Sequence, residues 1–379
     1  MSREFAGRGC CDKLPELLRS MGVRKVLVVT GKASYESSGA RAMFEPLLEG
    51  YQVVYFNQYS SNPLLEEAVA GAKLCRELNA DVVLAVGGGS AIDIAKCIVA
   101  FAAVPGQERD LATGAASLDA TVLPIIAVPT TAGTGSEATH FAVIYLDGKK
   151  YSLASPQLMP DMAFLDPGFT DNLPPDITAS TGFDALCQAI ESHWSAGATQ
   201  MSRAYAEEAI SLLLEYLPQA VNAPQPAARE AVFRAANLAG KAINISKTTA
   251  PHALSYTITS LYGIPHGHAV AMTLGAFIAL HDPGRGGELT EGVSPEDFLQ
   301  RNTRLLELMG VESNAAACQQ WYQLMTRCGL NVRLGAVDIA HSPDLEKVVA
   351  SVNVQRLKNH PLKLDAQQLL GVLRSIPST

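Results

Sequence analysis

Short apolar runs alternate with stretches of helical periodicity through the first half of the chain. Four runs, at residues 25–30, 51–56, 81–86 and 122–128, have the length and composition of buried strands. Between them, stretches such as residues 64–78 repeat apolar positions at the spacing of a helix. This alternation predicts a doubly wound parallel sheet, on which ligands bind beyond the carboxyl ends of the strands.

The pattern of apolar positions changes after this α/β part of the chain. Residues 145–164 still predict a β-hairpin followed by one more strand. Further on, apolar residues recur at helical spacing, as in residues 204–217, and strand patterns become sparse. We therefore predict two domains, an α/β domain over residues 1–167 and an all-α domain over residues 168–379.

Composition limits the partners of the chain. Its 379 residues are 48% hydrophobic and 17% charged, which is enough apolar material for two buried cores. A formal net charge of -8 argues against non-specific binding to nucleic acids or membrane surfaces. There is no apolar run of about 20 residues and no signal-peptide pattern, and the seven cysteines form no C-x-x-C pair. We therefore expect a cytoplasmic protein with reduced thiols.

A glycine-rich segment, residues 87–90, follows the third apolar run and precedes the helical residues 91–96. Glycines let backbone N–H groups approach a phosphate, and the N-terminus of a helix adds the positive end of its dipole. The segment predicts a site for a nucleotide pyrophosphate, although a tight turn without a ligand would use the same residues. A second Thr- and Gly-rich segment, residues 129–136, also follows a strand, so both segments can face one crevice.

Four polar side chains in the second half are candidates for a metal site. Asp184 and Gln188 are four residues apart, which places them on one face of a helix. His252 and His266 are fourteen residues apart, and Pro and Gly flank His266. An acid, an amide oxygen and two imidazoles could hold one divalent cation with a position left for a substrate oxygen. Histidines that are hydrogen-bonded within a core would fit the same spacing.

Four segments also match a known family pattern. Residues 87–96, 129–137, 184–186 and 265–267 read GGGSAIDIAK, PTTAGTGSE, DAL and PHG. Together they resemble the group III, iron-type alcohol dehydrogenases, and the resemblance covers essentially the whole chain. It implies a Rossmann-like dinucleotide-binding domain, an all-α domain as in dehydroquinate synthase-like proteins, and a metal in the cleft between them. It also implies a homodimer.

The resemblance assigns the cofactor, NADPH or NADH, to the α/β domain. Asp93 would orient the phosphate loop or contact the nicotinamide amide. Thr130 and Thr131 also fit strand-end caps, Phe141 a core position and Lys150 the surface of a hairpin. The full set implied at the cofactor comprises Gly31, Gly87, Gly88, Gly89, Ser90, Asp93, Thr130, Thr131, Ser136, Phe141 and Lys150.

The residue after the first strand bears on the choice of nicotinamide. In this family an acid at that place binds the ribose 2′-OH and repels a 2′-phosphate. Here the position is Gly31, and Lys32 and Ser34 follow closely. We therefore expect NADPH to be accepted and preferred, with NADH also usable.

The resemblance implies a divalent metal, Fe²⁺ or alternatively Zn²⁺, held by Asp184, His252 and His266. The family takes a further ligand from the position of Gln188, where this chain has an amide in place of an imidazole. Because an amide oxygen is a neutral and poorer ligand for iron, the identity of the metal is open.

A second departure concerns the proton relay. Many members of the family carry His-x-x-x-His, and the second of these positions is Tyr256 here. A phenol with an unperturbed pKa near ~10 is a poorer relay at neutral pH than an imidazole. Tyr256 could instead only pack, and His268 is the alternative relay.

Residues 246–256 read SKTTAPHALSY and, with the glutamine at position 188, resemble one branch of the family, the phosphonoacetaldehyde reductases. Lys247 lies five residues before a proposed metal ligand, so its ammonium could face a substrate phosphonate. Arg356 with Asn359 is a more distant candidate, and a solvated turn lysine is the alternative for Lys247.

We therefore expect an enzyme that reduces a small aldehyde to a primary alcohol by metal-assisted hydride transfer from NAD(P)H. The expected reaction converts phosphonoacetaldehyde to 2-hydroxyethylphosphonate, a step of phosphonate biosynthesis. A generic alcohol dehydrogenase acting on unsubstituted short-chain substrates is the alternative. The rivals from other classes are a dehydroquinate synthase-like lyase, which would show no net turnover of NADPH, and a non-catalytic binding protein.

Overall fold

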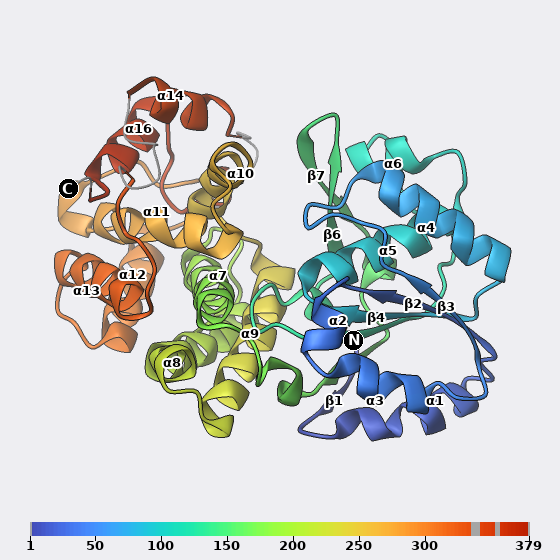
Figure 1. The fold of residues 1–379 in the computed structure, drawn as a ribbon. Coiled ribbons are helices and arrows are strands. Elements are labelled where there is room, and N and C mark those ends of the chain that lie inside the picture. The colour runs from blue at the N-terminus through green and yellow to red at the C-terminus, as the bar shows by residue number, and fades with distance from the viewer. Residues whose placement is uncertain (1, 335–341, 353–356, 378–379) are drawn as a thin grey trace. The chain divides into compact units, whose positions relative to one another are not determined.

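The structure is a computed structural model that describes residues 2–334, 342–352 and 357–377. The chain divides into two compact units, Met1–Leu173 and Pro174–Thr379, which Figure 1 colours along the sequence. The boundary that the sequence predicts, between residues 167 and 168, lies shortly before this division and stays a prediction. Arg356, one of the residues considered for the phosphonate, lies outside the described residues.

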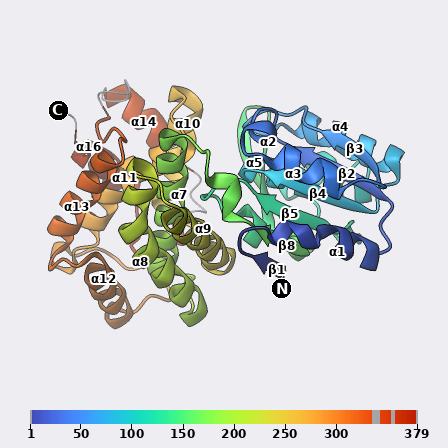
Figure 2. The ribbon, with the colours of Figure 1, turned by 60° about the horizontal axis from the view of Figure 1, so that its bottom comes forward.

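The first unit is built on a six-stranded sheet in which all pairings are parallel. The strand order is β1-β8-β5-β4-β2-β3, and the labels in Figure 2 follow it across the sheet. The predicted doubly wound parallel sheet is therefore confirmed. The strands are β1 (Arg3–Ala6), β2 (Lys25–Thr30), β3 (Gln52–Phe56), β4 (Val82–Gly87), β5 (Ile125–Pro129) and β8 (Met162–Leu165).

Helices cover both faces of this sheet (Figure 1). Along β4, Val83 and Ala85 belong to the core shared with α4 and α5, whereas Leu84 and Val86 belong to the core shared with α1 and α3. Burial on both faces explains why the strand reads as a continuous apolar run. The helices are α1 (Leu14–Ser20), α2 (Ser34–Ser37), α3 (Ala40–Leu47), α4 (Leu65–Leu78), α5 (Gly89–Ala103) and α6 (Glu108–Thr113).

A two-stranded ribbon follows β5 in the chain. Its strands β6 (Phe141–Leu146) and β7 (Lys149–Ala154) pair antiparallel. Asp147 and Gly148 form the turn between them, with φ angles of 50° and 71°. Two successive positive φ angles fit a tight hairpin turn, for which Asp-Gly is a favoured pair. The predicted hairpin is thus confirmed.

The described residues of the second unit form helices and loops, apart from an isolated bridge between Leu289 and Leu362. This confirms the predicted helical half. The central helix α7 packs against α8, α9 and α11 (Figures 1 and 2). The helices are α7 (Pro175–Trp194), α8 (Gln200–Asn222), α9 (Pro226–Ser246), α10 (Ala250–Tyr262), α11 (His266–Leu280), α12 (Pro295–Met309), α13 (Asn314–Arg327), α14 (Ser342–Ala350) and α16 (Ala366–Ser375).

Two expectations from composition concern membranes and thiols. None of the described helices combines the length and the hydrophobicity that crossing a bilayer requires. The seven cysteines, which all lie within the described ranges, are free thiols.

Candidate metal and cofactor site

The register of the sheet brings the predicted cofactor segments together. Thr30 is paired with Val86, and Gly87 with Pro129, so three neighbouring strands end at the same edge. Gly31, the glycine-rich segment and Thr130 follow these strand ends directly. This is the edge of a parallel sheet at which ligands bind.

Close packing accounts for the glycines of this segment. A Cβ on Gly87 would lie 2.7 Å from Cβ of Ala91, and one on Gly89 would lie 2.6 Å from the Thr134 side chain. Gly88 is the N-cap of α5, and a Cβ there would approach the Thr131 hydroxyl to 3.3 Å. The glycines therefore let the segment after β5 lie directly on the N-terminus of α5, where the helix dipole favours an anion.

Two polar residues of α5 fix the neighbouring segments. The Ser90 hydroxyl donates a hydrogen bond to the Ser61 carbonyl (2.7 Å). Asp93 accepts one from the Ser136 hydroxyl (2.5 Å) and one from the Val143 N–H (3.0 Å). Burial raises the pKa of the Asp93 carboxyl. Because both its oxygens are engaged within the protein, the contacts favour the loop-orienting role over contact with the nicotinamide.

Lys96 is a site residue to which sequence reasoning assigned no role. Its side chain is completely buried, and Nζ donates hydrogen bonds to the carbonyls of Ser136 (2.6 Å), Thr139 (2.8 Å) and Phe141 (3.0 Å). Burial lowers the pKa of this ammonium to about 8. Lys96 therefore ties α5 to the segment between β5 and β6. The available signal was its spacing of three from Asp93, which places both on one face of the helix.

The remaining cofactor candidates lie on segments that lead away from this edge. Thr130 is buried and Thr131 half-buried just after β5. Phe141 is half-buried at the start of β6, and Lys150 is half-buried on β7. Their contacts with a cofactor stay predictions.

Three of the four metal candidates form one group in the second unit. Asp184 lies on α7, His252 on α10 and His266 at the start of α11, with their ligand atoms within 4.8 Å of one another. Asp184 Oδ1 lies 3.3 Å from Nε2 of His252 and 3.8 Å from Nε2 of His266. Helices far apart in the sequence thus direct one carboxylate and two imidazoles to one point.

Gly267 explains why α11 can begin so close to α7. A Cβ at this position would lie 2.0 Å from the Ser180 carbonyl oxygen and 2.8 Å from Cβ of Asp184. Only a glycine lets the two backbones approach this closely. Pro265 is the N-cap of α11, so His266 is its first residue and lies over the carboxylate. Close packing and the start of the helix therefore explain the glycine and the proline of the Pro-His-Gly triplet.

Gln188 lies one turn after Asp184 on α7, as its spacing predicts, and it is buried. Its amide nitrogen donates a hydrogen bond to Asp184 Oδ2 (3.3 Å). This orientation makes the amide oxygen the atom that a cation would take. Gln188 can therefore add a neutral oxygen ligand to the Asp-His-His group.

The donor set fits a divalent cation. His252 Nε2 is buried and has no hydrogen-bond partner among the described residues, although Nδ1 is bonded to Glu191. A buried polar atom in this state is costly unless it binds a ligand. Burial alone would lower the pKa of His252, but the Glu191 and Asp184 carboxylates raise it to about 10. The same negative charges that favour a proton there favour a metal ion, and mixed N/O donors suit iron or zinc.

The two candidate relay residues differ in their surroundings. The Tyr256 ring stacks on the His266 ring, with centroids 5.6 Å apart and an interplanar angle of 8°. His268 is half-buried, and its Nε2 is bonded to the Asn331 carbonyl (2.6 Å). Burial also lowers the pKa of His268. The ring stack fits the packing role considered for Tyr256, and the relay roles of both residues stay predictions.

Lys247 is exposed and has a rare backbone conformation, with φ 62° and ψ 177°. This region is nearly restricted to glycine, and a lysine there costs about 1–3 kcal/mol. Asn359 stabilises the turn, because its amide donates to the carbonyls of Ser246 (2.8 Å) and Thr248 (2.9 Å) and accepts from the Gly197 N–H (3.0 Å). Sequence reasoning missed both the strain and the role of Asn359.

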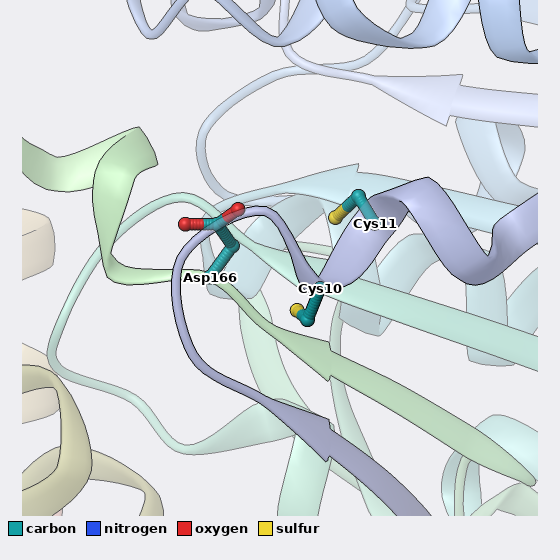
Figure 3. A group of neighbouring side chains, drawn as sticks. All are labelled: Cys10, Cys11 and Asp166. Atoms are coloured by element: carbon teal, nitrogen blue, oxygen red, sulfur yellow. The ribbon is translucent and has the colours of Figure 1, made fainter.

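A second group of close ligand-type atoms lies in the first unit. Ligand-type atoms of Cys10, Cys11 and Asp166, which are all buried, lie within 4.8 Å of one another. Figure 3 shows the two cysteines at the short helix after β1 and Asp166 on the segment that follows β8. The carboxylate accepts hydrogen bonds from the backbone N–H groups of Gly9 (2.8 Å) and Gly168 (2.9 Å). These bonds join the segment after β1 to the turn after β8, and we assign the group a structural role.

Comparison with known proteins identifies the family. Residues 2–167 match the family described as iron-containing alcohol dehydrogenase, and residues 178–376 match its C-terminal counterpart, the Fe-containing alcohol dehydrogenase family, C-terminal. The chain therefore belongs to the iron-containing alcohol dehydrogenase family.

Individual relatives differ in their named substrates. The chain is 34% identical to the NAD-dependent methanol dehydrogenase of Bacillus methanolicus over 69% of each protein. It is 33% identical to the phosphonoacetaldehyde reductase of Streptomyces viridochromogenes over 81% of this chain and 79% of the relative. The crystal structure of sulfoacetaldehyde reductase from Bifidobacterium kashiwanohense in complex with NAD⁺ is similar with a TM-score of 0.89, 31% identity, and coverage of 100% of this chain and 97% of that one.

Family and geometry together define the class of activity. The protein is a metal-dependent NAD(P) oxidoreductase that acts on aldehydes or alcohols. This supports the expected enzyme class over the lyase and the binding protein.

Proposed function

We propose that the protein reduces phosphonoacetaldehyde to 2-hydroxyethylphosphonate with NADPH. The main support for an anionic substrate is Lys247. This exposed cation is held in a strained turn five residues before the metal-site residue His252. Strained backbone persists where its surroundings impose it, and it gathers at functional sites. An ammonium at this place would bind a doubly charged phosphonate by charge-assisted hydrogen bonds.

The α/β unit would hold the cofactor. Backbone N–H groups of Gly88, Gly89 and Ser90, at the N-terminus of α5, would bind the pyrophosphate. Gly31 places no carboxylate beside the ribose, and Lys32 nearby would favour a 2′-phosphate. NADPH would supply the hydride that is added to the carbonyl carbon.

The helical unit would hold the metal through Asp184, His252 and His266, with Gln188 as a neutral fourth ligand. A divalent cation bound there would act as a Lewis acid on the carbonyl oxygen. Tyr256, whose ring stacks on that of His266, would deliver the proton that converts the reduced oxygen to a hydroxyl. Aldehyde, NADPH and one proton then give the primary alcohol and NADP⁺. Assembly as a homodimer stays a prediction.

The test is oxidation of NADPH and of NADH with phosphonoacetaldehyde, sulfoacetaldehyde, acetaldehyde and butyraldehyde, before and after chelation and re-addition of Fe²⁺ or Zn²⁺. We expect a kcat/KM at least tenfold higher for phosphonoacetaldehyde than for the uncharged aldehydes, and loss of activity on chelation that metal restores. Comparable or higher rates with uncharged aldehydes would support a generic alcohol dehydrogenase. A preference for sulfoacetaldehyde would assign the site to a sulfonate.

A further inference from the structure

Glu191 connects two parts of the helical unit that the proposed function uses. It lies on α7 seven residues after Asp184, on the same helix face, and its exposed fraction is 0%. One oxygen, Oε1, accepts a hydrogen bond from Nδ1 of His252. The other, Oε2, accepts from the N–H of Thr249 (2.6 Å) and from its hydroxyl (2.8 Å).

Thr249 extends this contact to the turn that carries Lys247. It is the N-cap of α10 and lies two residues after Lys247. Its hydroxyl also accepts a hydrogen bond from Nε1 of Trp194 (3.0 Å). One buried carboxylate therefore holds the metal-site imidazole with one oxygen and the end of the lysine turn with the other.

We propose that Glu191 is a positioning residue that orients His252 toward the cation and fixes the turn that presents Lys247. The inference rests on the proposed function, because it concerns the same site. The bond to Glu191 assigns Nδ1 as the donor nitrogen, so that Nε2, which lies 3.3 Å from Asp184 Oδ1, is the nitrogen that would bind the cation. Partners of this kind fix the ring of a ligating histidine and raise its basicity.

A carboxylate is required because three donors converge on Glu191: the imidazole N–H of His252, and the N–H and hydroxyl of Thr249. A carboxylate has two oxygens and accepts from all three. A glutamine of the same shape has one oxygen, so it must turn its NH₂ group toward one of these donors. Glu191→Gln should therefore leave one buried N–H group without an acceptor while filling the same volume.

The experiment compares wild-type protein with Glu191→Gln after removal of metal, by titration with Co²⁺ against a competing chelator. We expect the dissociation constant for Co²⁺ to rise about 10–100-fold and the visible Co²⁺ absorption bands to shift. The matched control is Ser192→Ala. It removes a buried hydrogen bond between the Ser192 and Ser246 hydroxyls, one residue along the same helix, and neither hydroxyl is hydrogen-bonded to His252 in the described part of the chain.

The Co²⁺ titration distinguishes a failure of this inference from a failure of the proposed function. A folded Glu191→Gln variant with wild-type Co²⁺ affinity and spectrum would overturn the inference. Wild-type protein that binds no Co²⁺ would instead contradict the proposed function. If Glu191→Gln does not fold, Glu191→Asp replaces it. This variant keeps the charge but is one methylene too short to reach both His252 and Thr249, so weaker Co²⁺ binding is again expected and unchanged binding would refute the inference.

Discussion

At the scale of single residues, Lys247 lowers the stability of the fold at a position where its charge is proposed to serve substrate binding. A glycine would adopt φ 62° and ψ 177° without steric strain, yet the chain has a lysine there. The Asn359 amide maintains the turn by donating hydrogen bonds to the carbonyls on either side of Lys247. These bonds offset the strain but do not remove it. The chain thus has a long cationic side chain at a position where a glycine would make the fold more stable.

Replacing Lys247 by glycine should therefore stabilise the protein and impair it at once. We expect Lys247→Gly to raise the free energy of unfolding by roughly 1 kcal/mol, since relief of strain exceeds the added entropy of the unfolded chain. The kcat/KM for phosphonoacetaldehyde should fall about tenfold or more, which corresponds to the loss of one charge-assisted hydrogen bond. The kcat/KM for acetaldehyde should fall far less. Urea unfolding and steady-state kinetics measure the two effects.

Two variants separate charge from strain in that experiment. Lys247→Ala removes the charge but retains the strained backbone, so it should lose activity without gaining stability. Lys247→Arg keeps a cation and should retain most of the preference for the anionic aldehyde. Equal losses for charged and uncharged aldehydes in all three variants would refute the role of Lys247 in substrate binding.

At the scale of elements, α7 and α11 owe the geometry of the metal group to one close approach. Asp184 and the first turn of α11 meet because position 267 has no side chain. The imidazole of His266 is placed by this backbone contact and by the start of the helix at the preceding proline. The geometry of the group therefore depends on the spacing of the two helices as well as on the identity of its ligands.

Gly267→Ala tests this dependence. The added methyl group would meet the Ser180 carbonyl oxygen at 2.0 Å, so α11 must move away from α7. We expect a loss of about 1–3 kcal/mol of stability and a Co²⁺ affinity at least tenfold weaker, measured by denaturant unfolding and chelator competition. Gly371→Ala is the control, because no atom of the described residues lies within 4 Å of a Cβ built there. Wild-type Co²⁺ affinity in Gly267→Ala would show that helix spacing is unimportant.

The same scale shows how far sequence reasoning reaches. The run ending at Val86 and the glycines after it predict both β4 and the N-terminus of α5, because strand and turn chemistry are local. The strand β1 escapes such reasoning, because residues 3–6 are mostly exposed and its pairing with β8 depends on residues far along the chain. The predicted start of β5 is also too early, since the strand begins at Ile125, after Pro124.

The site residues also differ in whether they could be recognised from nearby sequence alone. Asp184 and Gln188 are recognisable by spacing, and Glu191 continues the same helix face, so the pattern contained a signal that went unused. The buried partners of Lys96 and the strain at Lys247 depend on segments brought together only by folding. No periodicity or motif could reveal them.

At the scale of the whole molecule, a pair of buried histidines predicts how stability depends on pH. Nε2 of His281 lies 3.1 Å from Nε2 of His360, and both side chains are buried. Burial lowers the pKa of His281 to about 3, and it also lowers the pKa of His360. These rings are neutral in the folded protein, whereas in the unfolded chain they titrate near ~6.5.

The sign of the effect follows from where the protons bind. Between pH 6.5 and about 3 the unfolded chain binds a proton at position 281 and the folded protein does not, so His281 destabilises the fold as the pH falls. The slope is about 1.4 kcal/mol per pH unit for this one group. We expect urea unfolding of His281→Gln at pH 7.5, 6.0 and 5.0 to show a shallower loss of stability than wild-type protein. Parallel losses would contradict this assignment.

Asn359 has a consequence for the order in which this molecule can become active. The residue that closes the Lys247 turn is 113 positions later than Ser246, the residue whose carbonyl it binds. The ribosome releases all proposed metal ligands well before it releases Asn359, and a nascent chain folds from its N-terminus onward. An emerging chain could thus gather its metal-binding residues while its lysine turn is still open. Recognition of an anionic aldehyde would then be acquired later during synthesis than metal binding.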